Sequence, residues 1–132
     1  MAGSSRWITH GTRRVYASPW FATERWGWEI PAGWTDDGEE PAEAARREVL
    51  EESGYRVATV EPLMTYTPMS GISSQVYRVF LARGAVLVGE PEVAEADRVE
   101  WVPVAEVAKL MVAGQMPDGP SVTALGFFLA TR

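Results

Sequence analysis

Cysteine is absent from this sequence, and histidine occurs only once, as His10. Without thiols the chain cannot form disulfide bridges or thiolate metal sites. A single histidine also argues against a histidine-based catalytic triad and against a histidine-rich metal centre. Any metal site in this protein is therefore expected to use oxygen ligands.

Long apolar runs are also missing. No stretch approaches the roughly 20 residues of a membrane-spanning helix, and the first residues, MAGSSRWITHG, lack the apolar segment of a secretory signal. We therefore expect no membrane association and a cytoplasmic location. The sequence has 132 residues, of which 46% are hydrophobic, enough to bury a core. We expect a single domain over residues 1–132.

Basic residues are in the minority, with 12 Lys plus Arg against 18 Asp plus Glu and a net charge of −6. This balance argues against binding to a nucleic acid polymer and favours small-molecule ligands. Every basic residue except Lys109 is arginine. Arginine suits bidentate contacts with phosphate, although biased codon usage is an equally ordinary explanation.

Turn residues and apolar periodicity predict strands interrupted by one central helix and followed by two more helices. The expected strands cover residues 13–21, 25–33, 56–66, 73–83 and 98–104, and the expected helices cover 41–53, 104–114 and 121–132. The residues expected to pack on the sheet are Ala42, Ala45, Val49 and Ser53 in the central helix and Val122, Leu125 and Leu129 in the last helix. This order of elements predicts an α/β or α+β sandwich with a mixed sheet between helical layers.

The central helix carries Glu48, Glu51 and Glu52, whose side chains fall on one arc at about 100° per residue. At roughly 5 Å and an effective dielectric constant of about 20, two carboxylates repel by on the order of 3 kcal/mol, so a sheltered cluster needs protonation or a cation. Mg²⁺ or Mn²⁺ suits such ligands and takes the rest of its shell from water and a substrate phosphate. The alternative is a solvated acidic helix face.

These acids belong to a longer pattern. Gly33 is followed after five residues by Glu39, and after seven more by the run REVLEESGY at positions 47–55. The stretch resembles the Nudix box, G-x5-E-x7-R-E-U-x-E-E-x-G-U with U bulky and apolar, at every specified position. The resemblance implies a Nudix-type α/β/α sandwich. It also implies a hydrolase that cleaves the pyrophosphate bond of a nucleoside diphosphate linked to another group.

The resemblance assigns roles to single residues. It implies that Glu48, Glu51 and Glu52 bind the metal and take part in catalysis. Arg47 is similar to the family's buried arginine, which orients neighbouring carboxylates and belongs to the catalytic and substrate-binding set. The structural alternative for Arg47 is a surface partner of Glu43 or Glu51 on the same helix.

The residues around the acids have expected roles as well. Glu39 is similar to the glutamate that supports the loop before the helix, although an acid favoured by the helix dipole explains it nearly as well. Gly33 is expected to permit a sharp turn out of the preceding strand, and Gly54 a left-handed helix end. The expected substrate contacts are Trp28, Gly33 and Arg47. For the tryptophan, ordinary core packing is the alternative.

Two further segments resemble the ADP-ribose pyrophosphatase group of this family. WEIPAG, residues 28–33, implies that the backbone carbonyl of Ala32 binds the metal. The acidic segment 91–107 implies a catalytic or water-orienting glutamate, with Glu95 as first choice and Glu92 as second, or else an ordinary solvated loop. The segment Pro68–Gly71 departs from the usual Ser-Pro-Gly order, which leaves the substrate open.

The N-terminal segment 1–25 departs from the resemblance, because longer relatives run through additional strands before reaching WEIPAG. We expect shortened N-terminal strands. Most tryptophans lie in the first quarter of the chain, namely Trp7, Trp20, Trp26, Trp28 and Trp34. A sheet with fewer strands exposes an edge, which favours pairing with a second chain. We therefore expect a homodimer.

Three functional hypotheses follow. The first is a Mg²⁺- or Mn²⁺-dependent pyrophosphohydrolase that acts on ADP-ribose or a related nucleotide sugar. The second is a Nudix-fold sensor that binds a nucleotide without turnover, which the shortened N-terminal segment favours. The third keeps the chemistry but acts on nucleoside triphosphates or dinucleoside polyphosphates. The intact REVLEE run favours an enzyme, because a pure binder has no chemical need for every metal ligand.

Overall fold

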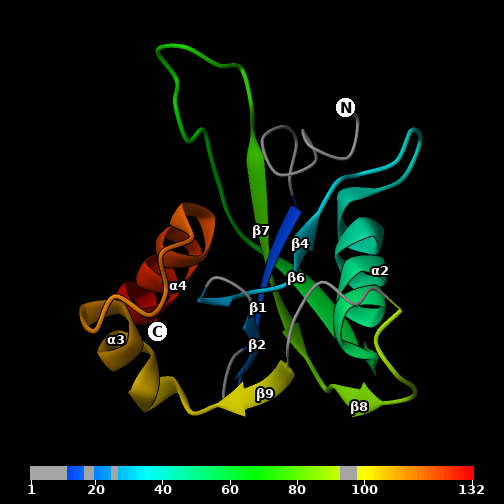
Figure 1. The fold of residues 1–132 in the computed structure, drawn as a ribbon. Helices are drawn as coiled ribbons and strands as arrows, with labels where there is room; N and C mark the ends of the chain where they lie inside the picture. Colours follow the sequence, from blue (N-terminus) through cyan, green and yellow to red (C-terminus); the bar gives the residue numbers. More distant parts are fainter. Residues whose placement is uncertain (1–11, 17–19, 25–26, 93–97) are drawn as a thin grey trace.

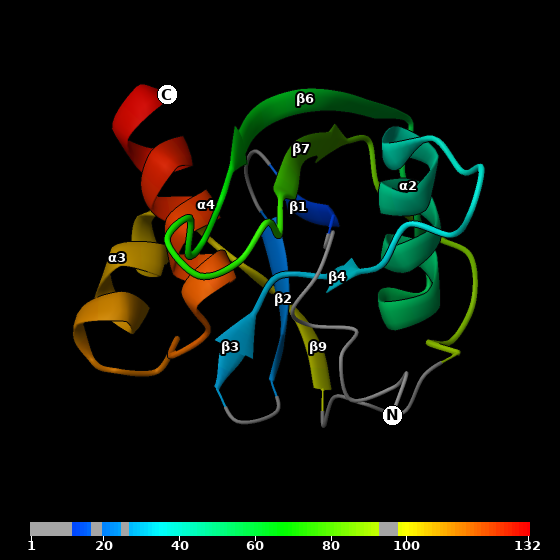
Figure 2. The same ribbon diagram turned by 90° about the horizontal axis from the view of Figure 1, so that it is seen from above.

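The computed structural model describes residues 12–16, 20–24, 27–92 and 98–132. Strands form the middle of the molecule, with helix α2 (Pro41–Ser53) on one side and helices α3 (Val104–Val112) and α4 (Gly119–Thr131) on the other (Figure 1, Figure 2). Each helix begins within one turn of its expected start. The arrangement confirms the expected α/β/α sandwich.

The strands form one larger and two smaller sheets. They are β1 (Thr12–Tyr16), β2 (Trp20–Glu24), β3 (Trp28–Glu29), β4 (Ala32–Gly33), β5 (Tyr55–Arg56), β6 (Thr59–Tyr66), β7 (Tyr77–Arg83), β8 (Val86–Leu87) and β9 (Arg98–Val102). The orders are β4-β1-β7-β6, β3-β2-β9 and β5-β8. Strand β1 runs parallel to β7, whereas β4 and β6 are antiparallel to their neighbours. The larger sheet is therefore mixed, as expected.

Two of the expected strands are divided. The stretch 13–21 contributes to β1 and β2, which lie in different sheets, and 25–33 contains the short strands β3 and β4. Pro31 cannot donate a ladder hydrogen bond, and the amide of Ile30 donates to Ser121 Oγ at 3.1 Å instead. These two residues therefore interrupt the extended run. Ser18-Pro19, a turn signal in the sequence, lies between the two strands and outside the described residues.

Helix α2 has the ends that its sequence predicts. Pro41 stands in the first turn, where a missing amide hydrogen is tolerated. Gly54 ends the helix in the left-handed region, with φ +78°, and its amide donates to Leu50 O at 2.8 Å. A Cβ on Gly54 would overlap the carbonyl oxygen of Gly89. Glycine at this position is therefore required by both conformation and space.

The packing of α2 differs from expectation at its N-terminal end. The buried residues of the helix are Ala44, Ala45, Val49 and Ser53. Ala42, expected in this set, is only half-buried. Ala44 lies one turn before Glu48 on the arc of the acids, and it is buried in the packing of the helix against the strands. The acidic arc is therefore partly covered by protein.

Helix α4 presents a different face to the core from the one expected. Its buried residues are Ser121, Ala124, Leu125 and Phe128. Of the expected stripe only Leu125 is buried, whereas Val122 is exposed and Leu129 is half-buried. Asp118 caps the helix by accepting from Ser121 N at 3.0 Å and Ser121 Oγ at 2.6 Å. Because Ser121 also accepts from Ile30 N, polar contacts help to set the rotation of the helix.

Apolar side chains from both helical layers meet the strands in one core cluster. It includes Val49 of α2, Val79 and Leu81 of β7, and Leu125 and Phe128 of α4. Burial of this kind is the main favourable term in folding. Within the described ranges, no helix combines the length and apolar character that crossing a bilayer would require.

Candidate active site

Glycine at position 33 lets α2 approach β4 closely. A Cβ on Gly33 would overlap the carboxyl group of Glu48, whose side chain is 13% exposed. The backbone of Gly33 is outside the left-handed region, so glycine at this position provides space for Glu48 and is not required by a positive φ. One residue earlier, the amide of Ala32 donates to both carboxylate oxygens of Glu52 at 3.3 Å. Two of the expected metal ligands thus lie along this short strand.

Arg47 links the loop before α2 to the acids on the helix. Its Nε and Nη2 donate to the two carboxylate oxygens of Glu39 at 2.9 and 3.0 Å. Its Nη1 donates to Glu48 at 2.9 Å and to Glu51 at 3.3 Å. Its Nη2 also donates to the carbonyl of Trp34 at 2.8 Å. These contacts go well beyond a surface pair on one helix.

The hydrogen bonds around Arg47 shift the pKa of two groups. Hydrogen bonding to Glu39 raises the pKa of Arg47, so the guanidinium stays charged at any working pH. The same hydrogen bond holds the pKa of Glu39 below its ordinary value, against the opposing effect of burial. Bidentate pairing of arginine with a carboxylate is among the stronger polar contacts in proteins.

Glu39 also closes the loop before α2. Its carboxylate accepts from the amide of Asp36 at 3.0 Å, and its own amide donates to Asp36 O at 3.0 Å. These bonds fit the expected loop-supporting role of Glu39. Its position just before the helix agrees with the helix-dipole explanation too.

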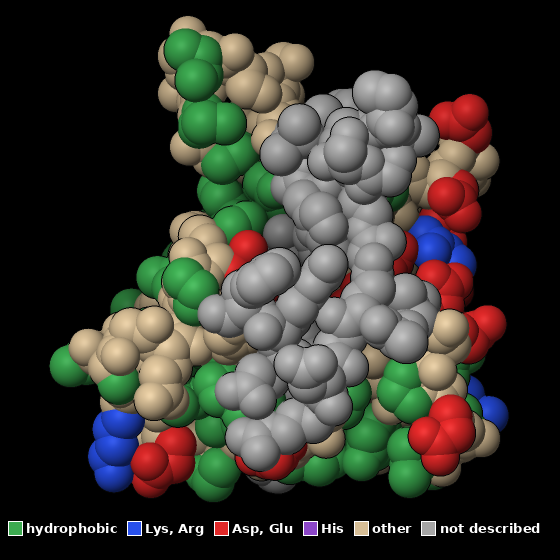
Figure 3. Space-filling model, viewed as in Figure 1, with side chains coloured by type: hydrophobic (Ala, Val, Ile, Leu, Met, Phe, Trp, Pro, Cys, Tyr) green, Lys and Arg blue, Asp and Glu red, His purple; other side chains and the backbone are tan. Residues whose placement is uncertain are grey.

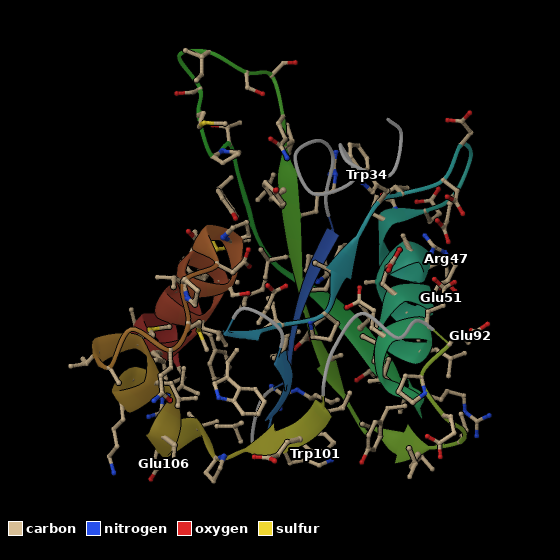
Figure 4. All side chains as sticks on the ribbon, in the orientation of Figure 1. Trp34, Arg47, Glu51, Glu92, Trp101 and Glu106 are labelled. Carbon is tan, nitrogen blue, oxygen red and sulfur yellow. The ribbon has the colours of Figure 1, made fainter. Side chains whose placement is uncertain are left out.

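The pKa of Glu51 is raised above its ordinary value. Burial raises its pKa, the charge of Glu48 raises it further, and Arg47 opposes both effects. Glu92 adds a smaller upward contribution, and its amide donates to Glu51 O at 2.7 Å. The second-choice loop glutamate is therefore next to the helix (Figure 4). Glu95, the first choice, lies outside the described residues.

The donor chemistry of the cluster fits a hard divalent cation, because every candidate ligand is an oxygen. One guanidinium, that of Arg47, is shared by several carboxylates. The raised pKa of Glu51 has burial as its main cause and the negative charge of Glu48 as its second. Figure 3 shows acidic side chains gathered on the α2 side of the molecule. In the parts of the chain that are described, no three acids or histidines converge as a metal-binding group. A divalent ion would therefore have to compete with Arg47 for the carboxylate of Glu48, or with the amide of Ala32 for the carboxylate of Glu52.

Trp28 is placed apart from the acidic helix. It is 6% exposed and belongs to the core cluster. Its amide donates to Gln115 O at 2.8 Å, and it lines a cleft beside α3 together with Trp101. Of the three expected substrate contacts, the structure places Gly33 and Arg47 close to the acids of α2. Trp28 lies instead beside α3, on the opposite side of the strands.

Two contributors to the site were missed in the sequence. The carbonyl of Trp34 fixes one end of the Arg47 guanidinium, and a backbone acceptor leaves no mark in residue type. Asp36 lies 3.8 Å from Arg47 Nε and bonds Glu39 through its backbone. The spacing of three residues between Asp36 and Glu39, in a turn-rich loop, could have indicated the contact between them.

Comparison with known proteins agrees with this geometry. The NUDIX domain family matches residues 12–121 of the chain. The chain is 45% identical over 107 residues to the CMP-5'-(N-acetyl-N-hydroxy-3-aminopropyl)phosphonate hydrolase of Streptomyces rubellomurinus, covering 80% of this chain and 51% of that protein. It is 37% identical over 99 residues to the ADP-ribose pyrophosphatase of Mycobacterium tuberculosis, covering 72% of this chain and 48% of that protein.

The chain spans about half the length of these curated relatives. A crystal structure of an ADP compounds hydrolase superposes with a TM-score of 0.76 at 19% identity, covering 91% of this chain and 70% of the other, which shows a shared fold. The box at residues 33–55, the sandwich architecture and the family match over most of the chain lead to one conclusion. The chain belongs to the Nudix family.

Proposed function

We propose that this protein is a metal-dependent Nudix pyrophosphohydrolase that acts on a nucleoside diphosphate linked to another group. The observation that carries the proposal is the hydrogen-bonded set in which Arg47 holds Glu39, Glu48 and Glu51 beside β4. A solvated acidic face would not need a shared arginine or a glycine that admits a carboxylate. The names of the relatives, which are hydrolases or pyrophosphatases, support the same class of reaction.

The chemistry follows from the charges. When bound, Mg²⁺ or Mn²⁺ would supply positive charge to balance the pyrophosphate and the leaving oxygen, and would lower the pKa of an attacking water. Glu48, Glu51 and Glu52, with the Ala32 carbonyl, are the residues that would hold it. Arg47 keeps the carboxylates oriented. Water adds to one phosphorus as the bridging P–O bond breaks, and the products are two phosphate-containing fragments.

Two substrate classes have support. ADP-ribose or a related nucleotide sugar is our first proposal, from WEIPAG and from the ADP-ribose pyrophosphatases among the relatives. A CMP group joined to a phosphonate is the second, because the relative with that name is 45% identical over 80% of the chain. Both classes contain a nucleoside monophosphate. They differ in the group that is attached to it through the bridging P–O bond.

A panel of nucleotides tests the proposal. The protein is incubated with Mg²⁺ or Mn²⁺ and with ADP-ribose, a nucleotide sugar, a CMP-linked phosphonate, a nucleoside triphosphate or a dinucleoside polyphosphate. Released nucleotide is then measured by mass spectrometry. We expect turnover of at least one diphosphate-bridged compound, removal of that turnover by EDTA, and a loss of about 100-fold or more in Glu52→Gln. The control is Glu61→Gln on β6, which removes an exposed carboxylate of the same kind.

The same panel separates the enzyme from the sensor. Saturable binding of a nucleotide with equal background hydrolysis by the native protein and Glu52→Gln would favour the sensor. Preferential cleavage of triphosphates or dinucleoside polyphosphates would favour the third hypothesis. The homodimer expected from an open sheet edge is also proposed here, and the cytoplasmic location stays a prediction.

A further inference from the structure

A run of apolar side chains is exposed on and just after strand β8. Val86, Leu87 and Val88, here called the β8 ridge, are 55%, 61% and 47% exposed. Single apolar residues are common on protein surfaces, but three in a row are not. Among the residues that the structure describes, no other large exposed apolar side chains are consecutive in the chain. Figure 1 shows β8 below α2. The ridge therefore offers a surface to another protein chain.

Strand β8 also has an open edge. On one side it pairs with β5, where Tyr55 is the partner of Leu87. The amide of Val88 donates to Gly54 O at 2.9 Å on this same side. Because backbone groups alternate along an antiparallel ladder, the amide and carbonyl of Leu87 point to the other side. No described strand pairs with β8 there. The backbone of Leu87 can therefore bind a further strand.

The edge strand β6 of the larger sheet is protected in ways that β8 is not. Pro62 lies within β6, and the ladder to β7 shifts register between Pro62 and Met64. Glu61 adds a charge to β6, 3.8 Å from Arg83 on β7. Proline, a bulge and charged side chains all hinder the addition of a strand. Strand β8 contains none of the three. Of these two edges, β8 is the better template for pairing.

Opposite charges flank the β8 ridge. Arg56 is the cross-strand partner of Val86, and Glu90 follows Val88 by two residues. Both charged residues are exposed, and neither forms a salt bridge within the described part of the chain. When two copies of the ridge run antiparallel, the Glu90 end of one lies toward the Arg56 end of the other. The ridge is therefore complementary in charge to a second copy of itself, as a two-fold interface requires.

A groove continues this surface beyond the ridge. It has a volume of about 430 Å³, and its lining includes Leu50 of α2 together with Arg56 and Val57. A stable interface buries about 800 Å² on each partner, which is more than three side chains provide. Because Arg56 belongs both to the groove and to the β5-β8 ladder, the two surfaces are contiguous. Glu39 and Arg47 also line the groove, so a partner on the ridge would border the proposed active site.

We infer that β8 pairs with β8 of a second copy of this chain, around a two-fold axis near Leu87. The pairing joins two small sheets into one four-stranded sheet in the order β5-β8-β8-β5. It removes two open edges from solvent and covers the exposed apolar ridge. It also brings the Arg56 guanidinium toward Glu90 of the partner subunit. The inference rests on the proposed homodimer, to which it assigns an interface, and is independent of the proposed hydrolysis.

Introduced cysteines test the interface directly, because the chain has none of its own. Val86→Cys, Leu87→Cys and Val88→Cys are oxidised separately under mild conditions, and the covalent dimer is measured by non-reducing electrophoresis. A disulfide needs Cα atoms about 4.4–6.8 Å apart, which paired strands provide near a two-fold axis. We expect at least one of the three to cross-link about 10-fold faster than Ile72→Cys, because pairing raises the effective concentration of the thiols.

Ile72 is a suitable control because its side chain, between β6 and β7, is 83% exposed and therefore at least as accessible to oxidation. Equal cross-linking rates for all four variants would overturn the inference.

Light scattering of the full chain separates this interface from the homodimer itself. Leu87→Asp should weaken dimerisation about 10-fold or more, because it places like charges close to the axis. Ile72→Asp adds the same charge elsewhere and should have little effect. A native dimer that resists Leu87→Asp would overturn this interface and leave the homodimer in place. A native single chain at every concentration would overturn both.

Charge reversal tests the direction of pairing. Arg56→Glu and Glu90→Arg should each raise the dissociation constant about 5-fold, since each places like charges together across the interface. The double variant restores opposite charges with their positions exchanged, so its dissociation constant should return to within about 2-fold of the native value. Additive losses in the double variant would overturn the antiparallel pairing. All the substituted side chains are exposed, so the fold is expected to persist.

Discussion

Arg47 connects a loop, a helix and a strand end through one side chain. It bonds Glu39 in the loop, Glu48 and Glu51 on α2, and the carbonyl of Trp34 after β4. A lysine could not reproduce this set, because a single ammonium lacks the planar fork that reaches several acceptors at once. The orientation of the acids therefore depends on arginine specifically. The glycine at 33 completes the arrangement by leaving room for Glu48.

Gly33→Ala should reduce hydrolysis while leaving the fold intact. The added Cβ would displace the carboxylate of Glu48, and a shift of about 1 Å in a reacting group can lower activity by about 100-fold. The displaced atoms are the end of a flexible side chain, so the free energy of unfolding should change little. The control is Gly71→Ala, where a Cβ meets no atom within 4 Å. The test compares kcat/KM, and native activity in Gly33→Ala would contradict the role of this space.

Glu39→Gln should destabilise the protein near neutral pH and have little effect in acid. Arg47 holds the pKa of Glu39 below 4.5 in the folded chain, so the ionised pair stabilises the fold above that pH. The contribution is lost as pH falls through the lowered pKa. We expect a difference of about 1 kcal/mol in the free energy of unfolding at pH 7, measured with urea, that shrinks toward zero in acid.

Glu43→Gln is the matched control for that measurement. Glu43 is an exposed acid of α2 that lies 3.5 Å from Arg46. Its removal should change the free energy of unfolding by a few tenths of a kcal/mol or less at either pH. A Glu39→Gln difference that persists undiminished in acid would assign the effect to packing instead of charge.

At the scale of elements, α2 illustrates which features local chemistry can predict. Pro41 at the start, helix-forming residues between, and Gly54 at the end mark its bounds without reference to other parts of the chain. The side that packs is harder to predict. Ala44 is buried although it lies on the arc of the acids, because α2 packs against several strands, among them β4, a strand of two residues. Which side of α2 is buried therefore depends on contacts with strands from other parts of the chain.

Gly54→Ala should cost more stability than Gly114→Ala. Both glycines have positive φ, +78° and +73°, so both substitutions carry the strain of a left-handed alanine, about 1 kcal/mol. Only at Gly54 would the Cβ also overlap a backbone carbonyl, that of Gly89. We expect an additional loss of about 1–3 kcal/mol at Gly54 in urea unfolding. Equal losses would show that the Gly89 loop can move aside.

At the scale of the whole molecule, the strands separate the acidic residues of α2 from the helices α3 and α4 (Figure 1). The α2 side concentrates carboxylates around Arg47, where a divalent cation and a pyrophosphate are proposed to bind. The α3 side contains a cleft lined by Trp28, Trp101 and Glu106. The residues around Arg47 come from one stretch of the chain, 32–52, whereas the cleft collects residues from β3, β9 and α3. Strand β6 forms one edge of the larger sheet.

The open sheet edge leads to a prediction about assembly. A strand edge with unpaired backbone groups favours pairing with a second chain. We expect a native mass of about twice 14.5 kDa by light scattering at micromolar concentration. Dilution should shift the equilibrium toward the single chain, because association depends on concentration. A mass of one chain at every concentration would contradict the homodimer.

Much of this protein was determined by its sequence alone. The box from Gly33 to Tyr55 and the bounds of α2 depend on residues close together in the chain, so they were predictable from spacing and capping. The order of elements predicted the sandwich for the same reason. The fit of the acids to a divalent ion followed from their charge and their helical period.

The tertiary structure decided what depends on contacts between distant residues. It divided the stretch 13–21 into two strands of different sheets, and through the bond between Ser121 and Ile30 it chose the buried face of α4. In the folded chain Arg47 donates to the carbonyl oxygen of Trp34, and a backbone acceptor cannot be recognised from the residue types in the sequence. It also moved Trp28 to a second cleft across the sheet. Such features depend on how elements pack, and packing free energy belongs to the whole fold and to no single segment.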